Sequence, residues 1–230
     1  LSQISFALSH GEILGVAGSS GSGQKELCEA IAGLQTPSGG SIRFHGNEIV
    51  GKSPREIIKL GISMSFIPED RLGMGLVASM DIADNILLKD YAFHKGIFID
   101  RKAARTKARQ IVSQLAINTP SIFHTVRKLS GGNIQKAILA RELNAEASVV
   151  VFNKPTYGLD LQNTRLAHER ILEGADAGLA TVVISTDLDE LLELSDRVVV
   201  MYQGSLVGIV ENGPDVERQV GLLMTGARAA

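Results

Sequence analysis

One passage near the amino terminus restricts the fold more than any other, because a short apolar run leads directly into a glycine-rich loop. Residues 13–17 (ILGVA) predict a strand, residues 18–23 (GSSGSG) a loop and residues 24–32 a helix. A strand, a glycine-rich loop and a helix in this order form the context in which backbone N–H groups hold phosphates. A glycine-rich turn without a ligand is the competing interpretation.

Short apolar runs alternate with helical patterns along most of the chain, which is typical of an α/β protein. From residue 76 to residue 129 strand signals are few and helical patterns are long, so we expect a separate helical lobe. Strands are expected at residues 6–8, 13–17, 41–44, 62–67, 149–152 and 181–184, with a hairpin over 198–210. Helices are expected at residues 24–32, 54–60, 82–88, 101–115 and 161–177, and directly after Gly131 and Asp187.

Composition excludes several classes of protein. The formal net charge is −2, and no basic stripe indicates a nucleic-acid partner. Cys28 is the single cysteine, so no internal disulfide framework is possible, which fits a reducing cytoplasm. No apolar run approaches the length of about 20 residues that crosses a bilayer. The chain begins at Leu1 rather than Met, and we expect it to be a fragment of a longer protein.

The phosphate loop departs from the full P-loop pattern, in which Lys follows the last glycine and Ser or Thr comes next. Gln24 cannot replace the charge of that Lys, which costs a charge-assisted hydrogen bond of about 1.5–3 kcal/mol. Protonated Lys25 cannot ligate Mg²⁺. A dinucleotide fingerprint fails as well, because it requires glycine at Glu26. We predict weakened nucleotide binding at the following residues: Gly18, Ser19, Ser20, Gly21, Ser22, Gly23, Gln24, Lys25 and Glu26.

The strand at residues 149–152 ends in Asn153 and Lys154, where phosphate hydrolysis calls for an acidic pair. Asn153 keeps an oxygen but no charge, and Lys154 is a cation where a general base is expected. Loss of a positioned base costs about 10²–10⁴-fold in rate. A polar turn after a strand would fit these two residues equally well, but the following residues 155–160 (PTYGLD) make that reading less suitable.

A second glycine motif, residues 129–136 (LSGGNIQK), stands directly before a helical pattern. Its adjacent glycines allow close approach to the backbone, and Ser130 stands where a helix cap is expected. The free N–H groups of the first helical turn would form an anion site. Taken alone, this motif is equally compatible with an ordinary glycine loop entering an amphipathic helix.

Together these motifs resemble the nucleotide-binding domain of ABC transporters over essentially the whole chain. The chain looks most like the second, degenerate ATPase half of the two-domain ATP-binding proteins of simple-sugar and nucleoside importers. The resemblance implies a P-loop NTPase (RecA-like) core over residues 1–75 and 145–230, with a small antiparallel β part. It also implies an inserted α-helical lobe over residues 76–144 that carries the signature motif. The matching stretches are residues 11–18, 21–24, 67–71, 129–136 and 195–201.

The resemblance implies a role for each position. Glu69 stands at the Q-loop position, and Thr186 stands where the family has its switch histidine, so γ-phosphate sensing from this half is in doubt. The family's adenine-stacking aromatic residue is expected upstream of Leu1. The signature motif and the D-loop acid, which act in trans on the ATP of a partner domain, would be Leu129, Ser130, Gly131, Gly132, Asn133 and Asp160.

The departures from the family pattern are confined to one of two groups of positions. The positions that serve the domain's own nucleotide depart from it, whereas those offered to a partner match it. Our hypothesis is that this half completes a competent ATP site on its partner, while its own site binds ATP weakly and hardly hydrolyses it. Whether that site takes Mg²⁺ is left open. The departing residues are Gln24, Lys25, Asn153, Lys154 and Thr186.

The implied partners are another ATPase domain, expected to be the other half of the same polypeptide, and a transmembrane permease. A periplasmic or extracellular binding protein would be an indirect partner, and no nucleic acid is expected. The implied location is cytoplasmic and peripheral, on the inner face of the membrane. A regulatory pseudo-ATPase outside transport stays open as an alternative. A soluble ABC ATPase of translation or DNA repair is disfavoured by the near-neutral charge and the lack of coiled-coil heptads.

The remaining candidate residues favour structural roles. The basic segment 101–109 is best interpreted as a solvated helix face, with a phosphate or partner contact as the alternative. Cys28 is best interpreted as a small core residue. No metal site is predicted, because the histidines are scattered without metal-ligand spacing: His10, His45, His94, His124 and His168.

Overall fold

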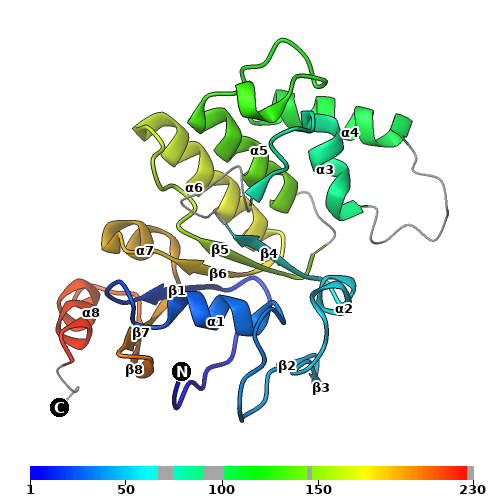
Figure 1. Ribbon diagram of the computed structural model, residues 1–230. Coiled ribbons are helices and arrows are strands. Elements are labelled where there is room, and N and C mark those ends of the chain that lie inside the picture. The colour runs from blue at the N-terminus through cyan, green and yellow to red at the C-terminus, as the bar shows by residue number, and fades with distance from the viewer. Residues whose placement is uncertain (67–74, 91–100, 144–146, 227–230) are drawn as a thin grey trace. The chain divides into compact units, whose positions relative to one another are not determined.

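The computed structural model describes residues 1–66, 75–90, 101–143 and 147–226 of the 230 (Figure 1). The chain forms two compact units. Unit 1 comprises Leu1–Met64, Ala147–Lys154 and Ile171–Ala230, and unit 2 comprises Ser65–Glu146 and Pro155–Arg170. Residues 155–170, which the sequence places in the ATPase core, group with unit 2 in this division.

The centre of unit 1 is a six-stranded sheet in the order β4-β5-β6-β1-β7-β8. Strands β5, β6, β1 and β7 run parallel, and β7 pairs with β8 antiparallel. Residues of β1 and β6 are buried throughout, as expected for parallel strands covered on both faces. The strands are β1 (Ile13–Ala17), β4 (Ile62–Phe66), β5 (Val149–Asn153), β6 (Ala180–Ile184), β7 (Arg197–Tyr202) and β8 (Ser205–Glu211).

Among the described residues, unit 1 contains the end of α6 (Leu161–Asp176) from Ile171 on and four whole helices: α1 (Gln24–Ile31), α2 (Pro54–Lys59), α7 (Leu188–Leu194) and α8 (Val216–Met224). The predicted capping box of α2 is confirmed, because Ser53 and Glu56 bond reciprocally through side chain and backbone. Asp187 caps α7 as predicted, accepting from the N–H groups of Asp189 and Glu190. Helix α7 packs against β1, and α8 packs against β7 and β8.

Unit 1 also contains a small separate antiparallel sheet, in agreement with the predicted small antiparallel β part. It is a two-stranded sheet of β2 (Arg43–Phe44) and β3 (Asn47–Glu48), so the predicted strand over residues 41–44 is only half correct. The predicted strand over residues 6–8 is wrong. In place of a strand ladder, the Ala7 carbonyl oxygen accepts a hydrogen bond from the Arg197 guanidinium.

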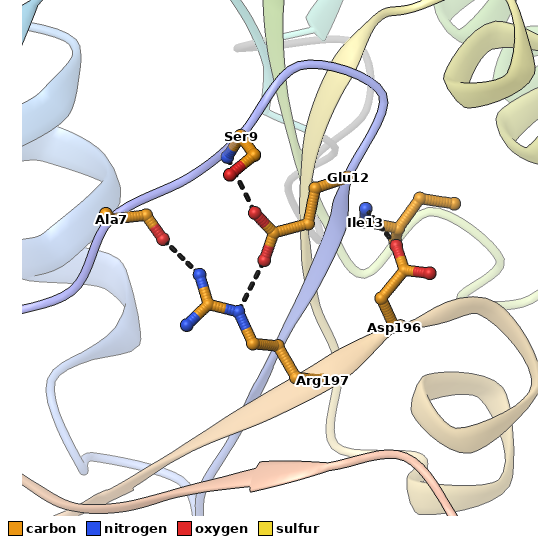
Figure 2. A network of polar contacts seen from close by, with 6 residues as sticks. All are labelled: Ala7, Ser9, Glu12, Ile13, Asp196 and Arg197. Atoms are coloured by element: carbon orange, nitrogen blue, oxygen red, sulfur yellow. Dashed lines mark hydrogen bonds and ion pairs between the residues drawn. The ribbon is translucent and has the colours of Figure 1, made fainter.

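The start of β1 is tied to the start of β7 by a network of polar contacts (Figure 2). The Arg197 guanidinium donates to the Glu12 carboxylate, which also accepts from the Ser9 N–H over 2.6 Å. The Ile13 N–H donates to the Asp196 carboxylate over 2.8 Å, and the Asp196 N–H donates to the Ile13 carbonyl over 2.9 Å. The motif at residues 195–197 thus holds two neighbouring strands in register.

Unit 2 is helical around one apolar core. Its elements are α3 (Ile82–Asp90), α4 (Arg101–Gln114), the 3₁₀-helix η2 (Val126–Lys128), α5 (Gly131–Leu143) and the first part of α6 (Leu161–Asp176). Helices α3, α4 and α5 pack against one another. The buried stripe of α4 consists of Ala104, Ala108 and Ile111, while Arg101, Arg105 and Arg109 are exposed. Within the described ranges, no helix is long and apolar enough to span a bilayer.

Candidate functional site

The glycine-rich loop follows the carboxyl end of β1, and its backbone passes close to β7. A Cβ atom at Gly18 would lie 2.8 Å from the carbonyl oxygen of Met201, closer than real Cβ atoms come. Gly21 and Gly23 have φ of 84° and 103°, a left-handed conformation that is strained for residues with a side chain. Glycine is therefore required by close contact at Gly18, by backbone conformation at Gly21 and by both at Gly23.

The turn between β7 and β8 lies against this loop and is hydrogen-bonded to it. The Gly204 N–H in that turn donates to the Ser22 carbonyl over 3.1 Å. Ser22 is buried, its N–H donates to the Ser19 carbonyl over 3.0 Å, and the two hydroxyl oxygens are 3.0 Å apart. The loop is thus held by its own bonds and by the hairpin.

Gln24 reaches back over the loop. Its Nε2 donates to the Ser19 carbonyl over 3.3 Å, so a neutral amide stands where the full P-loop pattern has a lysine. Gly23 is the N-cap of α1 and has no side chain to accept from the first turn of the helix. Uncapped N–H groups at a helix start attract anions, so the backbone suits phosphate and the side chain adds only a weak donor.

Lys25 takes part in an ion pair on the surface of α1. Its Nζ lies 3.7 Å from Oε1 of Glu29, and its side chain is 65% exposed. An ammonium group has no lone pair for a metal, so this position cannot provide the hydroxyl ligand that Mg²⁺ has in the full pattern. Glu26, the next residue, is exposed in the same first turn.

The other positions predicted to serve the domain's own nucleotide lie at the same edge of the sheet. Asn153 is in register with Ile184, and Ile184 is in register with Val16. Asn153 is the last residue of β5, and Thr186 and the loop follow β6 and β1, so all three lie at the carboxyl ends of neighbouring parallel strands, where α/β sheets bind ligands. Lys154 has φ of 54°, and its N–H donates to the Ile184 carbonyl over 2.7 Å.

At this edge of the sheet, the described residues at the predicted positions are not the acids and the histidine of the full pattern. Asn153, Lys154 and exposed Thr186 provide no carboxylate and no imidazole. Among the residues that the structure describes, no group of three or more His, Cys, Asp or Glu side chains could hold a metal ion. The donors that the described residues provide therefore do not fit Mg²⁺, whereas the backbone cradle fits phosphate. Glu69, predicted at the Q-loop position, lies outside the described residues.

The second glycine motif opens α5 in unit 2, as predicted. The side chain of Asn133 donates to Oγ of Ser130 over 2.8 Å, and its backbone N–H approaches the same oxygen at 3.5 Å. Oδ1 of Asn133 accepts from the Asn118 N–H over 2.8 Å, which ties the motif to the segment after α4. Ser130 and Gly131 are exposed, and Leu129 and Gly132 are partly exposed.

Asp160 caps the start of α6. Its carboxylate accepts from the backbone N–H of Asn163 over 2.9 Å and from the Asn163 side chain over 2.7 Å. The same Asn163 amide would lie 3.5 Å from a Cβ atom at Gly132, so Asp160 and the motif at α5 are neighbours within unit 2. The prediction from sequence did not include Asn163.

The sequence profile of the ABC transporter family matches residues 1–157. The chain belongs to this family. Among relatives of this ABC domain, the guanosine import ATP-binding protein NupO of Bacillus subtilis is 36% identical over 233 residues, covering 97% of this chain and 44% of the relative. The nucleoside import ATP-binding protein NupA of Lactococcus lactis is 38% identical over 226 residues, covering 97% and 44%. The ABC domain thus spans less than half the length of these relatives.

Solved ABC structures agree with the fold. The dimeric ATP-binding cassette MJ0796 in a post-hydrolysis state with ADP and Pi superposes with a TM-score of 0.78 at 18% identity, covering 91% of this chain and 89% of that one. The ADP conformation of the cassette MJ1267 gives a TM-score of 0.77 at 22% identity, covering 96% and 87%. The predicted P-loop NTPase fold of this ABC domain is confirmed.

Proposed function

We propose that this ABC domain is the ATP-binding, energy-coupling domain of an importer for a simple sugar or a nucleoside. It acts mainly by supplying its signature motif and Asp160 in trans to a competent ATP site on a partner ATPase domain. Relatives named as guanosine, nucleoside and ribose import ATP-binding proteins support the substrate class. Because the chain spans 44% of the first two relatives, the partner domain is proposed to be the other half of the same polypeptide.

One observation carries the trans role: the two sets of positions lie in different units. Unit 1 contains all the positions that depart from the hydrolytic pattern: Gln24, Lys25, Asn153, Lys154 and Thr186. The intact set, Ser130 to Asn133 with Asp160, belongs to unit 2, and Ser130, Gly131 and Asp160 are exposed there. A domain that offers its second set to another molecule needs those groups accessible.

The domain's own site is proposed to bind ATP weakly and without turnover. Backbone N–H groups of residues 19–25 would hold the phosphates, and Gln24 would contribute a neutral donor. Asn153, Lys154 and Thr186 provide no carboxylate or imidazole to act as a general base. Weak binding fits a structural role for this nucleotide, while hydrolysis takes place at the partner's site.

The remaining partners follow from the proposed transport role. A transmembrane permease would bind the domain at the inner face of the membrane, and a substrate-binding protein outside the membrane would act through that permease. The transported sugar or nucleoside would contact the permease and the binding protein rather than this domain.

The test compares one residue of each set in the protein as the cell makes it, purified with its permease. Ser130→Ala is expected to lower ATP turnover by roughly 10²-fold, the scale for one lost transition-state donor. The matched variant Thr186→Ala removes a hydroxyl from the domain's own site and is expected to leave turnover unchanged. Normal hydrolysis by Ser130→Ala would remove the trans role.

A further inference from the structure

Gln135 is a polar side chain in an apolar environment. It lies in the second turn of α5 and is completely buried (0% exposed). Its neighbours on the helix, Ile134 and Ile138, belong to the apolar core of unit 2. A buried amide is costly unless its polar atoms are paired, so an apolar side chain of similar length would suit this position better. The presence of an amide at residue 135 therefore needs a specific reason.

The amide is aimed at the loop of residues 155–160. Nε2 of Gln135 donates to the carbonyl oxygen of Pro155, which is itself buried. Oε1 is also buried and has no hydrogen-bond partner in the part of the chain that the structure describes. If this amide served only to pair polar groups, both its NH₂ group and its oxygen would have hydrogen-bond partners. The bond to Pro155 is thus the interaction that an apolar residue could not replace.

The far end of the same loop is also held against α5. Asp160 bonds twice to Asn163, and the Asn163 amide would lie 3.5 Å from a Cβ atom at Gly132. Between the two ends, the Leu159 N–H donates to the Thr156 carbonyl over 2.9 Å, which closes a short turn. The loop is therefore bonded to α5 at Gln135 at one end and lies beside α5 near Gly132 at the other, and all of these residues belong to unit 2.

We propose that Gln135 is a positioning residue that holds the loop of residues 155–160 against α5, so that Ser130 and Asp160 are presented together to the nucleotide of the partner domain. The trans part of this inference rests on the proposed function. Without the Gln135 bond, the buried Pro155 carbonyl loses its donor from α5, and the loop loses its hydrogen bond to that helix. Asp160 then moves relative to Ser130.

Three variants separate positioning from stability. Gln135→Met keeps the length of the side chain and removes the donor. Gln135→Glu keeps the shape, and its carboxyl can donate to Pro155 only when protonated. Asn85→Leu is the matched control, because Asn85 is a buried amide of unit 2 whose hydrogen bonds go to Val77 and Asp81, away from the loop.

The readouts are hydrogen exchange of residues 156–164 and ATPase kinetics of the whole protein with its permease. Gln135→Met is expected to speed exchange at Leu159 and Asn163 and to lower kcat roughly 10- to 100-fold, the scale for misplaced groups. KM for ATP is expected to stay unchanged, because the partner holds the ATP. Gln135→Glu is expected to recover toward wild-type kcat as the pH falls to about 6, where a buried carboxyl is protonated.

Two results would overturn the proposal. One is wild-type exchange in residues 156–164 together with normal kcat in Gln135→Met. The other is an equal fall of kcat in Asn85→Leu, which would show that activity follows the stability of unit 2. If Ser130→Ala leaves turnover unchanged, the proposed function fails by itself, and the exchange rates still decide whether Gln135 holds the loop.

Discussion

Arg197 at the start of β7 donates to the carboxylate of Glu12 at the entrance to β1, although the two residues are 185 positions apart (Figure 2). Partial burial works to raise the pKa of Glu12, but the hydrogen bonds from Arg197 and Ser9 outweigh it and leave this pKa below its ordinary value of 4.5. The bond to Glu12 also raises the pKa of Arg197. This pair fixes β1, and with it the start of the phosphate loop, to its neighbour in the sheet.

Glu12→Gln is expected to lower the free energy of unfolding at neutral pH by about 1.5–3 kcal/mol, the contribution of a hydrogen bond to a charged group. Because the pKa of Glu12 is lower in the folded than in the unfolded chain, its stabilisation is complete above the unfolded pKa and is lost as the pH falls through the folded pKa. Urea unfolding of both proteins at neutral and acidic pH checks this, with exposed Glu217→Gln as control. A difference between wild type and Glu12→Gln that persists at low pH would contradict it.

Gly18→Ala is expected to distort the phosphate loop, because its Cβ would meet the Met201 carbonyl at 2.8 Å. The expected loss of stability is about 1–3 kcal/mol, the range for overpacking, and nucleotide binding is expected to fall with it. Thermal unfolding and titration with a fluorescent ATP analogue measure both effects. Gly39→Ala is the control, since a Cβ at Gly39 has no atom within 4 Å. Equal behaviour of the two variants would show that the contact with β7 is unimportant.

Gln24→Lys is expected to tighten ATP binding by about 10- to 100-fold, because an ammonium replaces the neutral amide that now bonds to Ser19. Hydrolysis by the domain's own site is expected to stay absent, since Asn153 and Lys154 still provide no base. Titration with the ATP analogue and phosphate release by the isolated chain test the two parts. Unchanged affinity would mean that the missing charge does not limit binding, and Mg²⁺-dependent turnover by the wild-type chain would contradict the degenerate site.

Cys28 is expected to be unreactive in the folded chain. Its side chain is 0% exposed, and burial raises the pKa of its thiol to about 12. A thiol reagent at pH 8 should therefore modify it only at the rate of unfolding. Modification followed with and without urea measures this, and fast labelling of the native chain would show that α1 opens readily.

Local signals in the sequence predicted much of the fold. The loop between β1 and α1, the Ser53–Glu56 capping box and the hairpin after β7 depend on neighbouring residues, and all three occur as predicted. The predicted strand over residues 6–8 failed because its partner group is the side chain of Arg197, far away in the sequence. Sheet order could not be predicted, because β1 lies between β6 and β7 through long crossovers.

In the candidate site too, some residues could be predicted from local sequence and others could not. Its glycine motifs were visible as spacing, whereas the roles of Gln135 and Asn163 depend on packing between α5, the loop after β5 and α6. The sequence does show a glutamine that interrupts the apolar stripe of this helix. The pattern of polar and apolar residues does not identify the carbonyl group to which that glutamine donates.

Because the Gly204 N–H donates to the Ser22 carbonyl, the conformation of the phosphate loop depends on two segments that are far apart in the sequence. An insertion, affinity tag or loop graft at the β7–β8 turn would therefore also alter the proposed nucleotide site. Truncating the chain before this hairpin would remove one side of the cradle while leaving every residue of the glycine motif in place.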